Sequence, residues 1–158
     1  MSETPAVHST FVVERRYPKP PATVFAAFAD EATKRRWFAD GGGHEVTRFE
    51  TDFRPGGYER LDYRLGESTP FPGAEIANEE RFCDIVHDRR IVTSSVMAFG
   101  GRTISVLLVT TELMPEGDGT HLVCTVQGVF FEGSDGPQIR EHGWNVLLDL
   151  LGKVLADA

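Results

Sequence analysis

The amino-acid sequence predicts a single α+β domain over residues 1–158, in which a curved seven-stranded antiparallel sheet surrounds a long C-terminal helix. A chain of 158 residues favours one domain with a core of its own. Apolar and polar residues alternate from about residue 44 to about residue 131, as they do in half-buried strands. The chain then ends in a long segment with one apolar side, and such a helix must lie on a sheet to bury that side.

The N-terminal part predicts a strand followed by two short helices. Pro20 and Pro21 suit the first turn of a helix, where proline is tolerated. Glycines at 41–43 end the second helix, because glycine commonly stops helices. The expected segments are a flexible tail at 1–7, a strand at 8–17, helices at 22–30 and 31–39, and a stop at 40–43.

Six further strands are predicted from the change to a period of two. Short turns rich in glycine, such as Pro55-Gly56-Gly57 and Gly100-Gly101, separate them, and turns of this length join neighbouring antiparallel strands. The expected strands are 45–53, 57–65, 76–86, 90–98, 102–114 and 119–131.

The closing segment predicts an amphipathic helix that starts near Pro137 and has Lys153 near its end, which matches helix polarity. Gly143 and Gly152 each cost about 1 kcal/mol relative to alanine in a helix, so packing must offset them. The residues expected along its apolar side are Ile139, Trp144, Leu147, Leu148, Leu151 and either Val154 or Leu155.

Composition argues against several classes of protein. A net charge of -8 disfavours binding to nucleic acid or to anionic membranes. No apolar run approaches the roughly 20 residues that span a bilayer, and the first residues lack the pattern of a secretion signal. We therefore expect a cytoplasmic protein without membrane insertion, in which Cys83 and Cys124 are buried free thiols.

The sequence offers no catalytic, metal or cofactor motif that we would assign. The five histidines lack the spacing of metal ligands. The sequence also lacks a nucleophile elbow and a phosphate-binding loop. We therefore expect neither a metal nor a cofactor.

Glu59 breaks the pattern of its strand, because it shares its alternation parity with Leu61, Tyr63 and Leu65. An unpaired carboxylate in a dry core is costly. Three interpretations are open: a polar group in a partly wet pocket, an internal pair with an arginine, or a misjudged register that turns Glu59 to water.

Several stretches resemble one known family, the Hsp90 ATPase activator homologue (AHSA1-like) family of the SRPBCC, or Bet v 1/START-like, superfamily. They are "YPKPPATVFAAFADEATKRRWFADG" (17–41), "TDFRPGGYERLDY" (51–63), "CDIVHDRRIVTS" (83–94), "VTTELMPEGDGTHLVCT" (109–125) and "HGWNVLLDLLGKVL" (142–155). The third stretch departs from the family pattern, since His87 and Asp88 stand where the family has two prolines. The resemblance covers nearly the whole chain and implies the helix-grip fold, with Glu59, Leu61 and Tyr63 on the inner face of the sheet.

The same resemblance implies a cavity between the curved sheet and the final helix. Aromatic side chains with a few polar groups typically line small-molecule pockets. We therefore expect a small apolar or aromatic ligand, such as a lipid, in a hydrophobic cavity. The predicted pocket residues are Trp37, Phe38, Phe49, Phe53, Glu59, Leu61, Tyr63, Phe82, Trp144, Leu147, Leu148 and Leu151.

Two other functions stay open on the sequence. A cyclase or hydrolase acting on a polyketide-like or aromatic substrate could use Glu59 as a general acid or base near Tyr63. A chaperone-associated domain would instead bind a protein partner through its surface, as the family name suggests. Free strand edges also make a homodimer plausible.

Overall fold

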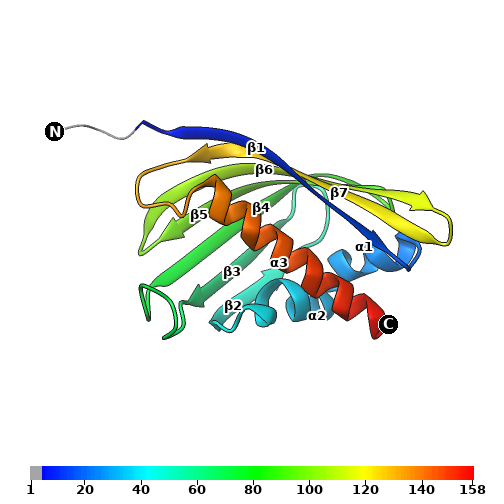
Figure 1. Ribbon diagram of the computed structural model, residues 1–158, viewed down its shortest axis with the longest axis horizontal. Coiled ribbons are helices and arrows are strands. Elements are labelled where there is room, and N and C mark those ends of the chain that lie inside the picture. The colour runs from blue at the N-terminus through cyan, green and yellow to red at the C-terminus, as the bar shows by residue number, and fades with distance from the viewer. Residues whose placement is uncertain (1–4) are drawn as a thin grey trace.

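A computed structural model, shown in Figure 1, describes residues 5–158 and contains one seven-stranded antiparallel sheet with the strand order β1-β7-β6-β5-β4-β3-β2. The strands are β1 (Val7–Tyr17), β2 (Glu45–Thr51), β3 (Tyr58–Arg64), β4 (Glu75–Val86), β5 (Arg90–Phe99), β6 (Arg102–Glu116) and β7 (Gly119–Phe130). The helices are α1 (Pro21–Ala29), α2 (Glu31–Lys34) and α3 (Pro137–Ala156). A π-helical turn (Arg35–Ala39) and a 3-10 turn (Asp40–Gly42) follow α2.

The sheet curves around α3, which crosses one of its faces, while α1 and α2 lie near the C-terminal end of α3 (Figure 1). Consecutive strands from β2 to β7 pair as hairpins, and β1 pairs with β7 along its whole length, from Val7 opposite Phe130 to Tyr17 opposite Thr120. The predicted architecture is confirmed, and every strand begins and ends within two residues of its expected bounds.

The core lies between the inner face of the sheet and α3. Leu148, Leu151 and Leu155 of α3 are buried there. Tyr17 at the end of β1 holds α3 against the sheet, because its hydroxyl donates a hydrogen bond to the Leu148 carbonyl at 2.7 Å. Its ring also lies over Gly152, where a Cβ atom would come within 3.3 Å of the ring. Gly152 therefore makes room for Tyr17, and this contact offsets the low helix propensity of glycine.

Three local expectations were wrong. Residues 35–39 form a π-helical turn, in which the Asp40 amide donates to the Arg35 carbonyl, instead of continuing an α-helix. Cys83 is exposed, because it follows the inward-facing Phe82 in β4 and therefore lies on the outer face of the sheet. Ile139 is 63% exposed, since the first turn of α3 extends past the packed core.

The N-terminal prediction falls partly on residues 1–4, which lie outside the described residues. Val7, the last residue of the expected tail, is already paired with Phe130 in β1. In the part of the chain that the structure describes, no helix is both long enough and apolar enough to cross a membrane.

The packing of α3 on the sheet makes a testable prediction. Leu151→Ala should lower the free energy of unfolding by about 3 kcal/mol, because it leaves a cavity in the centre of the core. Val146→Ala on the exposed side of the same helix is the matched control and should change it by less than about 0.5 kcal/mol. Denaturant unfolding followed by circular dichroism measures both values. Equal losses for the two variants would contradict the assigned helix face.

Candidate functional site

A stripe of polar side chains crosses the inner face of the sheet beneath α3. It contains Glu59 of β3, Asn78 and Glu80 of β4, and Thr93 and Ser95 of β5. All five are buried. They share the inner face with apolar neighbours at the same alternation parity, so the register places them in the interior rather than in water.

Glu59 is paired with Lys34, the last residue of α2. The Lys34 Nζ lies 2.7 Å from the Glu59 Oε2, and the two residues are 5% and 1% exposed. The same ammonium lies 4.5 Å from the centre of the Phe38 ring, a favourable arrangement of a cation over an aromatic face. Of the three interpretations of Glu59, the internal pair is therefore the one observed, with a lysine in place of the expected arginine.

Glu80 lies directly across from Glu59 on the neighbouring strand. Its Oε1 accepts a hydrogen bond from the Asn78 side-chain amide at 3.3 Å, and the Asn78 Oδ1 accepts one from the Ser95 hydroxyl at 2.9 Å. Burial, followed by the negative charge of Glu59, raises the pKa of Glu80 to about 7, although the positive charge of Lys34 opposes the rise.

A small internal cavity lies beside this polar group. Its volume is about 20 Å³, and Lys34, Glu80, Thr93, Thr111 and Trp144 contribute to its walls. A space of this size holds about one water molecule. The interior next to the ion pair is therefore nearly filled by side chains.

A much larger groove lies at the other end of the sheet, away from α1 and α2. The loop between β3 and β4, the adjoining ends of β5 and β6, the loop between β7 and α3, and the first turn of α3 surround a volume of about 410 Å³. We call this space the mouth groove. Its walls are mainly apolar and include Phe71, Ile76, Met97, Phe99, Ile104 and Ile139.

Two apolar side chains stand at the rim of the mouth groove on opposite sides. Phe71, from the loop, is 60% exposed and packs edge-to-face on Phe99 with ring centres 5.4 Å apart. Ile139, from the first turn of α3, is exposed to a similar degree. Large apolar groups exposed around a concavity often mark a binding site.

Arg140 holds the start of α3 beside the mouth groove. Its guanidinium donates to both carboxylate oxygens of Asp135, at 2.7 and 2.8 Å, and to the Ser105 hydroxyl at 3.0 Å. Burial would raise the pKa of Asp135, but the hydrogen bond and charge of Arg140 outweigh it and hold that pKa below its usual value. Asp135 therefore forms a fixed, ionised part of the groove wall.

Tyr63 of β3 forms the inner polar edge of the mouth groove. Its ring stacks on His44, with ring centres 4.9 Å apart. Burial raises the pKa of Tyr63, so its hydroxyl keeps its proton at neutral pH. The buried Nδ1 atom of His44 has no hydrogen-bond partner among the described residues.

The twelve predicted pocket residues do not gather around a single space. Tyr63 lines the mouth groove, whereas Trp37, Phe38 and Trp144 line the small internal cavity. The remaining eight pack in or beside the core or belong to the ion pair: Phe49, Phe53, Glu59, Leu61, Phe82, Leu147, Leu148 and Leu151.

Sequence reasoning missed most residues of both sites. Glu80 could have been found by the argument applied to Glu59, because it has the parity of Ile76 and Phe82 and so shares a strand face with them. Lys34 gave no such signal, since a lysine in a short, charged helix usually points into water. Phe71 lies in a loop that has no hydrophobic periodicity, so only the tertiary fold shows that it lies at the rim of the mouth groove.

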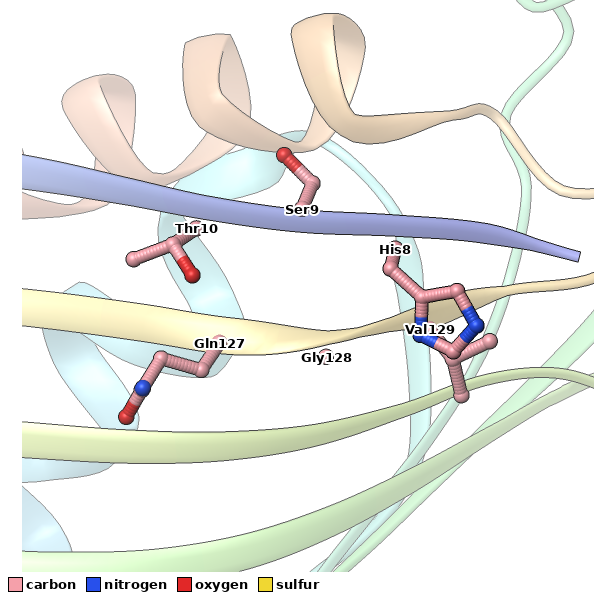
Figure 2. Close-up of a pocket in the computed structure, with 6 residues that line it drawn as sticks. All are labelled: His8, Ser9, Thr10, Gln127, Gly128 and Val129. Carbon is pink, nitrogen blue, oxygen red and sulfur yellow. The ribbon is translucent and has the colours of Figure 1, made fainter.

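Figure 2 shows a second hollow, at the pairing of β1 with β7, in which the side chains of His8, Thr10, Gln127 and Val129 are drawn beside Gly128. His8 lies opposite Val129, and Thr10 lies opposite Gln127. The hollow is shallow, and the residues that line it include no phenylalanine, tyrosine or tryptophan and no buried charge. It is a weaker candidate for a binding site than the mouth groove.

Within residues 5–158, no three histidine, cysteine or acidic side chains are grouped to hold a metal ion.

Comparison with known proteins gives a family match over most of the chain. Residues 18–156 match the sequence model of the family described as Activator of Hsp90 ATPase homolog 1-like protein. No curated protein matches the chain in sequence.

Solved structures agree with this match. The Mll3558 protein from Rhizobium loti is 46% identical, with a TM-score of 0.85 over 96% of this chain and 99% of that one. A protein from Rhizobium leguminosarum is 34% identical, with a TM-score of 0.90 over 98% of each chain. An AHSA1-like protein from Aeromonas hydrophila is 19% identical, with a TM-score of 0.69 over 94% of this chain and 93% of that one, and shares the fold.

The Lys34–Glu59 pair makes a second prediction. Lys34→Met should lower the free energy of unfolding by about 3 to 5 kcal/mol at pH 7, because it leaves buried carboxylates without their cation. The loss should shrink at pH 5, because Glu80 is then protonated and fewer buried charges lack a cation. Lys153→Met, at an exposed position of α3, is the control and should be nearly neutral. A loss at Lys34 that does not change with pH would contradict the electrostatic explanation.

Proposed function

The chain belongs to the family of Activator of Hsp90 ATPase homolog 1-like proteins, and on that premise we propose that it binds a small apolar or aromatic molecule in the mouth groove. The observation that carries the proposal is the groove itself. Its volume of about 410 Å³ falls within the range of roughly 300 to 1,000 Å³ that is typical of ligand pockets.

The lining of the groove supports an apolar ligand. Ile76 and Ile104 form a buried apolar floor, and Met97 supplies an unbranched side chain that adapts to different shapes. Phe71 and Ile139 at the rim would lose their exposure to water when a ligand covers them. Burying apolar surface gains about 25 cal/mol per Å², so the two rim residues favour an occupied groove.

The polar groups at the edge of the groove limit the chemistry of the ligand. The Tyr63 hydroxyl can donate or accept a hydrogen bond, whereas the ionised Asp135 can only accept one. Arg140 already neutralises Asp135. The groove therefore suits an uncharged molecule with one hydroxyl or similar group near Tyr63, rather than an anion or a strong cation.

Binding fits the geometry better than catalysis by Glu59. The Glu59 carboxylate is 1% exposed and is held by Lys34, and it does not line the mouth groove. A general acid or base must reach its substrate directly or through one water. We therefore propose a carrier or sensor of a small molecule instead of a cyclase or hydrolase that uses this residue.

Cytoplasmic location stays a prediction. So does a homodimer, which the free edges of β1 and β2 would permit.

A substitution that fills the groove tests this proposal. Met97→Trp should lower the affinity for Nile red, a neutral aromatic probe, at least tenfold, because the indole occupies the space meant for the ligand. Val96→Trp is the matched control, since Val96 immediately precedes Met97 in β5, is exposed, and does not line the groove. Fluorescence titration measures both affinities.

Three results would count against the proposal. They are a wild-type protein that does not bind the probe, equal losses at positions 96 and 97, or retained binding in Met97→Trp. Circular dichroism of each variant should match the wild type, so that a loss of binding is not confused with a loss of fold.

A further inference from the structure

We propose that Glu59 and Glu80 together bind one proton, which they release as pH rises through neutrality, and that in the protonated site a neutral Glu80 donates a hydrogen bond to Oε1 of Glu59. The pair then forms a proton-binding site in the interior of the sheet, balanced in charge by Lys34. This site is distinct from the mouth groove, and the inference does not depend on the groove taking a ligand.

The strand register brings the two carboxyl groups together. Glu59 of β3 and Glu80 of β4 are direct partners, and both are buried on the inner face. Side chains directly opposite each other on antiparallel strands have Cβ atoms about 4.5 to 5.5 Å apart. Two carboxylates at that separation repel each other, and in a dry interior water does little to screen them.

The hydrogen bonds of Glu59 and Glu80 leave one carboxylate oxygen without a donor. Oε2 of Glu59 accepts from Lys34, and Oε1 of Glu80 accepts from Asn78. Oε1 of Glu59 is buried and has no partner among the described residues. A buried acceptor without a donor costs about 1 to 3 kcal/mol, and more when it is charged. A proton on the remaining oxygen of Glu80 supplies the missing donor.

The charges around Glu59 and Glu80 also favour one bound proton. Lys34 of α2 brings one positive charge against two carboxyl groups. The thiol of Cys124 on β7 is within electrostatic reach of Glu80, and burial raises its pKa to about 12, so it is neutral. The other elements packed around Glu80 contribute uncharged groups, including Thr93, Thr111 and Trp144. One bound proton therefore makes the site neutral, which a low-dielectric interior strongly favours.

The raised pKa of Glu80 fits this arrangement and fixes the sign of its effect on stability. The ordinary value is 4.5 and the value in the fold is about 7, so between these pH values the folded chain binds more protons than the unfolded chain. Stability therefore falls as pH rises through this window. The water-sized cavity beside Glu80 could hold a water molecule with which the Glu80 proton exchanges.

The direct test is a carbon-13 NMR titration of side-chain carboxyls in protein labelled at glutamate. In the wild type we expect one carboxyl to titrate near pH 7. That resonance should vanish in Glu80→Gln and remain in Glu79→Gln, the neighbouring residue on the outer face. If every wild-type glutamate titrates below pH 5.5, or if the resonance near pH 7 survives in Glu80→Gln, the proposal is overturned.

Two further variants separate proton sharing from simple burial. In Glu59→Gln, Lys34 is free to pair with Glu80, so the Glu80 carboxyl should titrate below pH 6. If the Glu80 carboxyl still titrates near pH 7 in that variant, the proposal that the two carboxyls share a proton is overturned.

The melting temperature of Glu80→Gln should rise relative to that of the wild type as pH goes from 5 to 8, whereas the melting temperature of Glu79→Gln should not. A flat difference for Glu80→Gln also overturns the proposal.

Discussion

The packing of α3 across the inner face of the sheet is the contact on which the rest of the structure depends. Leu148, Leu151 and Leu155 bury one side of the helix, and the hydroxyl of Tyr17 binds its backbone. A sheet of this kind exposes an apolar face that must be covered. Because one helix covers only part of a wide, curved face, the space beneath α3 differs from one end of the sheet to the other.

At the end near α2 the space is closed, and its contents are polar. The Lys34–Glu59 pair is enclosed by aromatic rings, which leaves a cavity of about 20 Å³. Buried ion pairs of this type add little net stability, because the cost of removing both charges from water offsets their attraction. Breaking such a pair by removing one partner is nevertheless costly, because the other charge is then buried without a counter-charge.

At the other end the space is open, and its lining is apolar. Three segments distant in sequence meet there: the loop after β3, the adjoining ends of β5 and β6, and the loop that leads into α3. The ion pair of Arg140 with Asp135 fixes the last of these segments, so one wall of the groove is rigid. A pocket that is formed in advance loses less entropy when it takes a ligand. The support for the proposed ligand binding therefore comes from the shape and lining of the groove.

The sequence by itself determined the order of the elements and the shared parity of Glu59 with Leu61, because these follow from local periodicity and turn residues. Only the tertiary structure decided that Lys34 neutralises Glu59, that Glu80 lies across from it, and that Phe71 and Ile139 form the rim of a groove. Those contacts join residues far apart in the chain, and periodicity along one segment carries no information about which other segment will face it.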